Sequence, residues 1–95
     1  MNDAVAISAE SKPHLPRGMH LKHDATRDEW LLMAPERVLK LNGVAVEILK
    51  RCDGNATLSE IVDQLAAAFA ADRAVIDKDV RALLAELAAK RMVDL

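Results

Sequence analysis

The segment Ala34-Pro35-Glu36-Arg37-Val38-Leu39-Lys40-Leu41 limits the possible folds more than any other part of the sequence. Pro35 has no amide hydrogen and cannot lie in the middle of a hydrogen-bonded sheet, so it marks a strand end or edge. The alternation after it predicts a short strand from Arg37 to Leu41. The two faces of that strand are Arg37, Leu39 and Leu41 on one side, and Val38 and Lys40 on the other.

A short strand that follows a break and contains charged residues is typical of a sheet edge. An edge strand has unpaired amide and carbonyl groups along one side. Two interpretations are open: Arg37 and Lys40 only protect the edge against unwanted pairing, or the edge is offered to an extended peptide.

Two other strand-like segments precede this one. Met19 to His23 alternates apolar and polar residues, and Trp30 to Met33 is more apolar, with a polar turn between them. Together the three segments predict a small three-stranded antiparallel sheet. Such a sheet needs a helical cover to be stable.

Three amphipathic helices are expected after the strands. Their predicted N-terminal caps are Asn42, Thr57 and Asp72, and the first and third helices are expected to end near Cys52 and Arg91. The expected inward stripes are Ala45, Val46, Ile48 and Leu49, then Leu58, Ile61, Val62, Leu65 and Phe69, then Ile76, Val80, Leu83, Leu84 and Leu87. Strands followed by helices predict an α+β domain with the helices packed on one face of the sheet.

The length of 95 residues fits one domain with a modest core. Residues 1–15 are mostly polar and small, so we expect them to form a flexible tail. We expect a folded domain over residues 16–95. The net charge of -2 argues against a general nucleic-acid or membrane-surface binder. The single cysteine, the lack of a long apolar run and the lack of a secretory signal predict a cytoplasmic location.

The candidate chemical groups do not form a recognisable active site. His20 and His23 are expected on opposite faces of a strand, so we predict no metal site. Cys52 follows Lys50 and Arg51, which could lower its pKa, but its place at the end of an amphipathic helix favours a buried structural role. No nucleophile with a nearby base and no phosphate-binding loop is evident, so we predict that the chain is not an enzyme.

A small winged-helix DNA-binding regulator is the alternative function for three helices beside a small sheet. Residues 53–95 contain five Lys or Arg against eight Asp or Glu, whereas residues 17–51 contain seven against five. A recognition helix in the acidic half would repel phosphates, so the charge distribution favours a peptide or protein partner over DNA.

A cleft is expected if the third helix packs near the edge strand. The strand would then bind an extended peptide through its main chain, while apolar helix residues receive alternate peptide side chains. The candidate peptide-binding residues are Arg37, Val38, Leu39, Lys40, Leu41, Val80, Leu83, Leu84 and Leu87. Most of the four helix residues are expected to belong to the core instead.

Several segments together resemble the PqqD family of pyrroloquinoline quinone (PQQ) biosynthesis. They are Leu21-Lys22-His23-Asp24, the run from Trp30 to Asn42, Cys52-Asp53-Gly54, and Asp79-Val80 with Leu83 to Leu87. The resemblance covers about residues 16–95. It implies a winged-helix-like fold and a peptide chaperone, a RiPP (ribosomally made, modified peptide) recognition element. Such a chaperone binds the precursor peptide PqqA along the third strand and presents it to the radical S-adenosylmethionine enzyme PqqE.

The resemblance implies no catalytic residue, cofactor or metal for this chain itself. Nucleic acid and membranes are not expected partners. We expect a monomer, although two copies could form a weak dimer by pairing their free strand edges.

Overall fold

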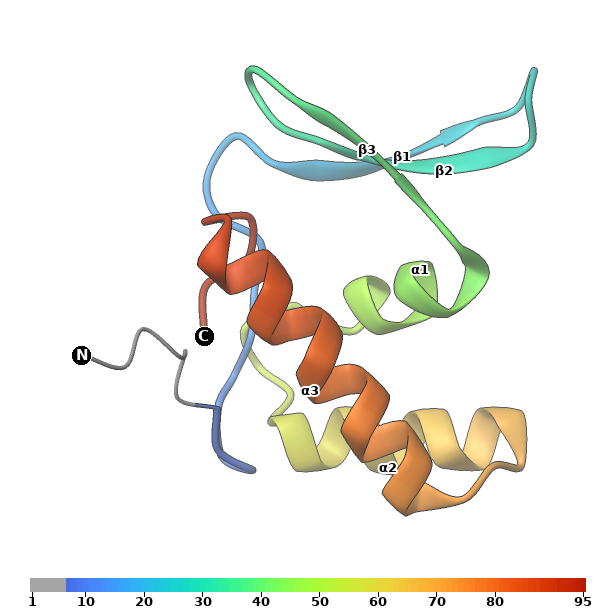
Figure 1. Ribbon diagram of the computed structural model, residues 1–95, viewed down its shortest axis with the longest axis vertical. Helices are drawn as coiled ribbons and strands as arrows, with labels where there is room; N and C mark the ends of the chain where they lie inside the picture. The colour runs from blue at the N-terminus through green and yellow to red at the C-terminus, as the bar shows by residue number, and fades with distance from the viewer. Residues whose placement is uncertain (1–6) are drawn as a thin grey trace.

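The computed structural model describes residues 7–95 and shows three strands followed by three helices (Figure 1). The elements are β1 (His20–Asp24), β2 (Glu29–Met33), β3 (Val38–Leu41), α1 (Gly43–Lys50), α2 (Leu58–Phe69) and α3 (Arg73–Ala89). The predicted class, a three-stranded antiparallel sheet followed by three helices, is confirmed.

The strands form one antiparallel sheet in the order β1-β2-β3, so β2 is central and β3 is an edge. Ala34 and Arg37 exchange main-chain hydrogen bonds of 2.9 and 3.4 Å and close a tight hairpin with Pro35 and Glu36 at its tip. β3 therefore begins one residue later than predicted, because Arg37 belongs to the hairpin closure. Pro35 lies in the turn, where its missing amide hydrogen costs no sheet bond.

Helix α1 connects the sheet to the rest of the molecule. It contacts β1 and β3 on one side and α2 on the other, while α2 packs along α3 (Figure 1). The sheet contributes one fully buried side chain, Leu32, to a core that otherwise comes mainly from the three helices. The half-buried side chains of Leu21, Leu39 and Leu41 pack against this core from the same face of the sheet.

The predicted helix caps are confirmed. Asn42, Thr57 and Asp72 each accept a hydrogen bond from a main-chain amide in the first turn of their helix. At α2 the Thr57 hydroxyl accepts from the Glu60 amide, and the Glu60 carboxylate accepts from the Thr57 amide, which completes the predicted capping box.

The segment before β1 differs from the separate tail that the sequence predicts. Residues 1–6 lie outside the described residues, but the segment 9–14 is hydrogen-bonded to the domain. The carbonyls of Ser11 and Ala9 accept from the amides of Leu58 and Ser59, at 2.7 and 3.0 Å. Pro13 is fully buried, and His14 forms isolated β-bridges with Asp53 and Asp94. The composition suggested a tail because the main chain makes most of these contacts. Main-chain hydrogen bonds leave no recognisable pattern of side chains in the sequence.

One apolar prediction needs correction, and two core residues were missed, at the helix ends. Phe69 was expected in the core, but its side chain, in the last turn of α2, is 48% exposed. Met92 and Val93, after α3, are both buried and belong to the core, although they are not part of any helical stripe. In the part of the chain that the structure describes, no helix has the length and apolar character needed to cross a membrane.

Candidate peptide-binding site

The outer side of β3 is unpaired within residues 7–95. Successive residues of an antiparallel pair alternate between hydrogen-bonded and non-hydrogen-bonded positions. Since Arg37 exchanges both bonds with Ala34, the next residues of β3 bonded to β2 are Leu39 and Leu41. The main-chain groups that face away from the sheet are therefore the N–H and C=O of Val38 and Lys40.

The side chains of β3 divide between its two faces, as the sequence predicted. Leu39 and Leu41 are half-buried and pack against the core, whereas the Val38 side chain is 56% exposed. Lys40 extends from the exposed face, and its Nζ lies 3.0 Å from a carboxylate oxygen of Glu29 on β2. The Lys40 side chain of this pair is largely exposed, so the pair orients Lys40 without adding much stability.

The helix residues predicted to line a cleft lie in two different environments. Val80, Leu84 and Leu87 are almost completely buried and belong to the core. Leu83 is only partly buried, because its side chain lies at the border between the core and an open cavity. The structure therefore places Leu83 at the border of this cavity and leaves the other three residues in the core.

An open cavity of about 320 Å³ lies where β3 leads into α1, facing the middle of α3. From α3 it is lined by Leu83, Ala82 and Asp79, and from the start of α1 by residues that include Val44. Val44 is 50% exposed, and neither it nor Asp79 was among the predicted site residues. The sequence did contain a signal for Val44, because it is an apolar residue that lies outside the inward stripe of α1.

A second open cavity, of about 350 Å³, lies at the opposite end of β3, under the β2–β3 hairpin. It is bordered by Arg37, by residues just before β1 and by the residues that end α3. A cavity thus lies at each end of β3; residues of α3 line the first, and Lys90, Arg91 and Met92, which follow α3, line the second. No residue of β1, the other edge strand, lines either cavity.

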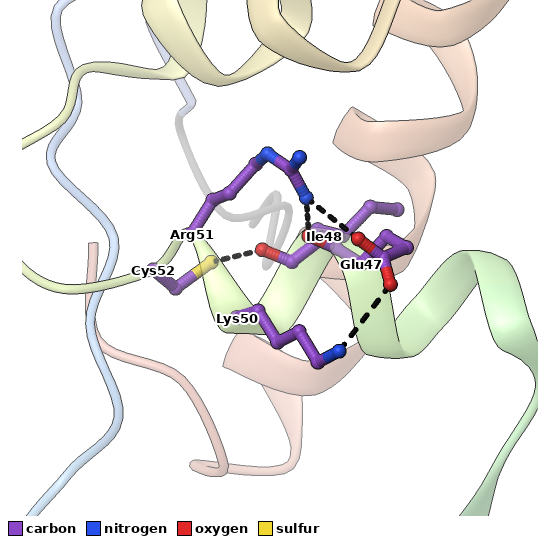
Figure 2. A network of polar contacts seen from close by, with 5 residues as sticks. All are labelled: Glu47, Ile48, Lys50, Arg51 and Cys52. Atoms are coloured by element: carbon purple, nitrogen blue, oxygen red, sulfur yellow. Dashed lines mark hydrogen bonds and ion pairs between the residues drawn. The ribbon is translucent and has the colours of Figure 1, made fainter. Parts of the chain in front are cut away.

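Cys52 has a structural environment. Figure 2 shows its thiol donating a hydrogen bond to the Ile48 carbonyl at 3.3 Å, while Lys50 and Arg51 both turn toward Glu47. Burial, with a smaller effect of the Asp53 charge, raises the pKa of the Cys52 thiol to about 12. The hydrogen bond from Arg51 holds the pKa of Glu47 below its usual range. The interpretation of Cys52 as a buried structural residue is therefore confirmed.

The histidines make separate contacts. The His23 ring packs against the Trp30 ring, with centroids 4.9 Å apart, and its Nε2 lies 3.1 Å from Asp28. His14 belongs to the segment before β1, far along the chain from His23. Among residues 7–95 no three His, Cys, Asp or Glu side chains are grouped as a metal ion would require.

Comparison with known protein families gives one match that covers most of the domain. Residues 29–93 match the family described as coenzyme PQQ synthesis protein D (PqqD). A protein of Rhodopseudomonas palustris strain BisB5, named PqqA binding protein, is 50% identical over 86 residues, which are 90% of this chain and 84% of that protein. A Xanthomonas oryzae pv. oryzae protein of the same name is 46% identical over 95% of this chain and 98% of its own length.

Two solved structures are similar to this fold. One is the solution structure of the PqqD portion of Methylobacterium extorquens PqqCD, described as a functional, stand-alone RiPP recognition element. It has a TM-score of 0.83 and 41% identity, and the match covers 95% of this chain and 96% of the other. The crystal structure of Xanthomonas campestris PqqD has a TM-score of 0.60 and 43% identity, with 95% and 100% covered.

Proposed function

This chain belongs to the PqqD family of coenzyme PQQ synthesis proteins, and we propose that it binds the precursor peptide PqqA as an additional strand on β3. The observation that supports this most directly is the unpaired edge of β3, whose outward N–H and C=O groups are those of Val38 and Lys40. An extended peptide would complete these bonds as a fourth strand of the sheet. The relatives from Rhodopseudomonas and Xanthomonas are named for binding PqqA.

The cavity beside α3 would receive side chains of the bound peptide. A residue of the bound peptide that points toward α3 would contact Leu83 and Val44, the partly exposed apolar side chains that border the cavity. Main-chain bonds to β3 would give affinity, and this contact would give selectivity for an apolar side chain. In this proposal Leu83 is the one of the four candidate α3 residues that contacts the peptide, and the other three belong to the core, as was expected for most of them.

We also propose that the bound peptide is presented to the radical enzyme PqqE. In this scheme the present chain acts by binding, in agreement with the names of its relatives as a binding protein and a recognition element. The binding form would be a monomer, because a second copy paired along β3 would occupy the same edge. DNA binding has no further support, since the family match accounts for the winged-helix-like arrangement.

Amide hydrogen exchange, measured by NMR with and without PqqA, tests the strand addition residue by residue. In the free protein the amides of Leu39 and Leu41 should exchange slowly because β2 accepts them, whereas those of Val38 and Lys40 should exchange fast. Saturating PqqA should slow Val38 and Lys40 by about tenfold or more, since each amide gains an acceptor. Protection of Leu21 and His23 instead would place the peptide on β1. The absence of any alternating pattern of protection would exclude strand addition.

The substitution Lys40→Pro tests the same edge by affinity. Proline removes an amide that faces outward, so the β2–β3 bonds remain while one bond to the peptide is lost. We expect PqqA affinity, measured by calorimetry, to fall by about tenfold or more. His23→Pro is the matched control, because it removes an outward amide from the β1 edge and should leave affinity unchanged. Equal affinities for the two folded variants would contradict binding at β3.

The handover to PqqE needs a separate measurement. If presentation occurs, the amount of PqqA that PqqE modifies should increase when the wild-type chain is added and should increase less with Lys40→Pro. A product yield that is the same with and without the chain would exclude presentation and leave peptide binding untouched.

A further inference from the structure

The cavity under the β2–β3 hairpin is strongly basic. Four of its lining residues, Arg17, Arg37, Lys90 and Arg91, have positively charged side chains, and one, Glu36, is acidic. The basic residues come from three separate parts of the chain: the approach to β1, the β2–β3 hairpin and the residues that follow α3. The chain as a whole has a net charge of -2, so this concentration of positive charge opposes the overall balance.

The charges of this cavity are mostly not neutralised by the protein. Lys90 forms an ion pair with Glu86 at 3.2 Å. Arg17, Arg37 and Arg91 form no ion pair with any other residue in the range 7–95, and all three are exposed. Like charges around one hollow repel each other unless an anion lies between them. We call these three arginines the arginine cluster.

Arg91 occupies a backbone position that normally favours glycine. Its φ angle is 60°, and it follows α3 in a Schellman motif, in which the Met92 amide donates to the Leu87 carbonyl at 2.8 Å. An L-residue with a side chain is destabilised in this left-handed conformation. A cation near a helix C-terminus is favourable, but Lys90 already provides one on the same turn. The arginine at this position is therefore better explained by a ligand than by folding.

A strand added through main-chain bonds alone has no fixed register. The free edge offers the same N–H and C=O pattern every two residues, so a peptide can slip by two residues and keep its bonds. It can also bind in either direction. A charged contact at one end of the edge would remove both ambiguities, because only one alignment brings the peptide charge to the cavity.

We propose that the arginine cluster binds a carboxylate of the peptide that adds to β3, and thereby sets the direction and register of that peptide. This inference rests on the proposed function. The acidic peptide residue would lie at the hairpin end of β3, and an apolar residue would reach Leu83 and Val44 at the other end. β3 has four residues, or roughly 13 Å at a strand rise of about 3.3 Å per residue, so the two peptide residues should be about four to six positions apart.

Arg91→Gly separates this role from folding. Glycine is better suited to the left-handed position, so the melting temperature should rise, while the loss of one cluster charge should weaken PqqA binding by about fivefold at low salt. Arg27→Gly is the matched control, since Arg27 is an exposed arginine in the β1–β2 turn that lines neither cavity. It should bind PqqA as tightly as the wild type.

A double-mutant cycle identifies the carboxylate. Copies of PqqA in which each Asp or Glu is changed singly to Asn or Gln are titrated into the wild type and into Arg91→Gly. One altered peptide should bind the wild type about fivefold more weakly than unaltered PqqA does. The same peptide change should have little effect on binding to Arg91→Gly, because its partner charge is already absent. The inference is overturned if no carboxylate couples to Arg91, or if replacing all three arginines by Gln leaves affinity unchanged.

The outcomes also separate this inference from the proposed function. If PqqA still protects the Val38 and Lys40 amides while the arginine variants bind like the wild type, strand addition stands and the cluster has no role in it. If the wild type neither binds PqqA nor gains protection at β3, the proposed function itself is wrong.

Discussion

At the scale of single residues, Cys52 shows how position in the fold overrides sequence neighbours. Its neighbours Lys50 and Arg51 could have lowered the pKa of the thiol, but both bind Glu47 instead (Figure 2). Lys50 also lies over the Trp30 ring, 4.7 Å from its centroid, which directs it to the sheet. The thiol is left among apolar side chains with one carbonyl acceptor, and its pKa rises to about 12.

The raised pKa of Cys52 predicts a loss of stability at high pH. The unfolded thiol ionises with a pKa near its ordinary value of 9.0, whereas the folded thiol stays protonated up to about 12. Ionisation therefore favours the unfolded chain as the pH rises above 9 toward 12. Between pH 8 and 11 the wild type should lose about 2.5 kcal/mol more unfolding free energy than Cys52→Ala in urea titrations. Equal losses in both proteins would show that the thiol is already ionisable in the folded state.

Leu83 and Leu84 mark the limit of what the sequence could predict for the site. The helical period placed both on the inward side of α3, and the structure confirms that Leu84 is fully buried. Period alone cannot tell that Leu83 lies at the border of the stripe, because this depends on how far α1 covers α3. The outward groups of Val38 and Lys40 likewise required the hairpin closure at Arg37, which only the structure provides.

At the scale of elements, the local signals predicted most boundaries correctly. Asn42, Thr57 and Asp72 cap their helices because capping depends only on residues within one turn. The helix ends were less predictable, since two residues other than glycine, Ala70 and Arg91, adopt left-handed conformations there. Both ends resemble Schellman motifs, and at α2 the Ala71 amide donates to the Ala66 carbonyl at 3.0 Å.

The end of α2 predicts a stabilising substitution. Ala70 has a φ angle of 50°, which glycine adopts without the steric cost of a Cβ atom. Ala70→Gly should raise the unfolding free energy by about 0.5–1 kcal/mol in denaturant titrations. The same chemical change inside the helix, Ala67→Gly, should lower it by about 1 kcal/mol, because there glycine only adds flexibility to the unfolded chain. Changes of the same sign at both positions would contradict the assigned conformation of Ala70.

At the scale of the whole molecule, the segment before β1 joins parts of the chain that the sequence could not connect. The amide and carbonyl of His14 both bond to Asp94, at 2.8 and 2.9 Å, and the Pro13 carbonyl accepts from Gly54. The same segment satisfies two of the first amides of α2 through Ser11 and Ala9. The fold class was predictable because it follows from the order of strand and helix patterns along the sequence. These long-range main-chain bonds leave no such pattern.

Removal of residues 1–15 should therefore weaken the domain. The deletion leaves α2 amides and the Asp94 main chain without their protein partners and uncovers the site of buried Pro13. We expect a loss of about 3 kcal/mol in the free energy of unfolding. His14→Ala keeps every main-chain bond and should cost less than about 1 kcal/mol, because its ring contact with Asp94 is solvated. A deletion that costs no more than this substitution would show that the segment only lies on the surface.

The bridge between His14 and Asp94 also has a consequence for the folding pathway. It joins positions near opposite ends of the sequence, so its formation closes nearly the whole chain into a loop, at a large entropic cost before any contact offsets it. Helices and the β2–β3 hairpin need only local contacts and can form earlier. We therefore expect the bridge to form after the main folding barrier, so that it slows unfolding more than it speeds folding. Loss of the bridge should therefore raise the unfolding rate and shorten the lifetime of the native state, with little effect on the folding rate.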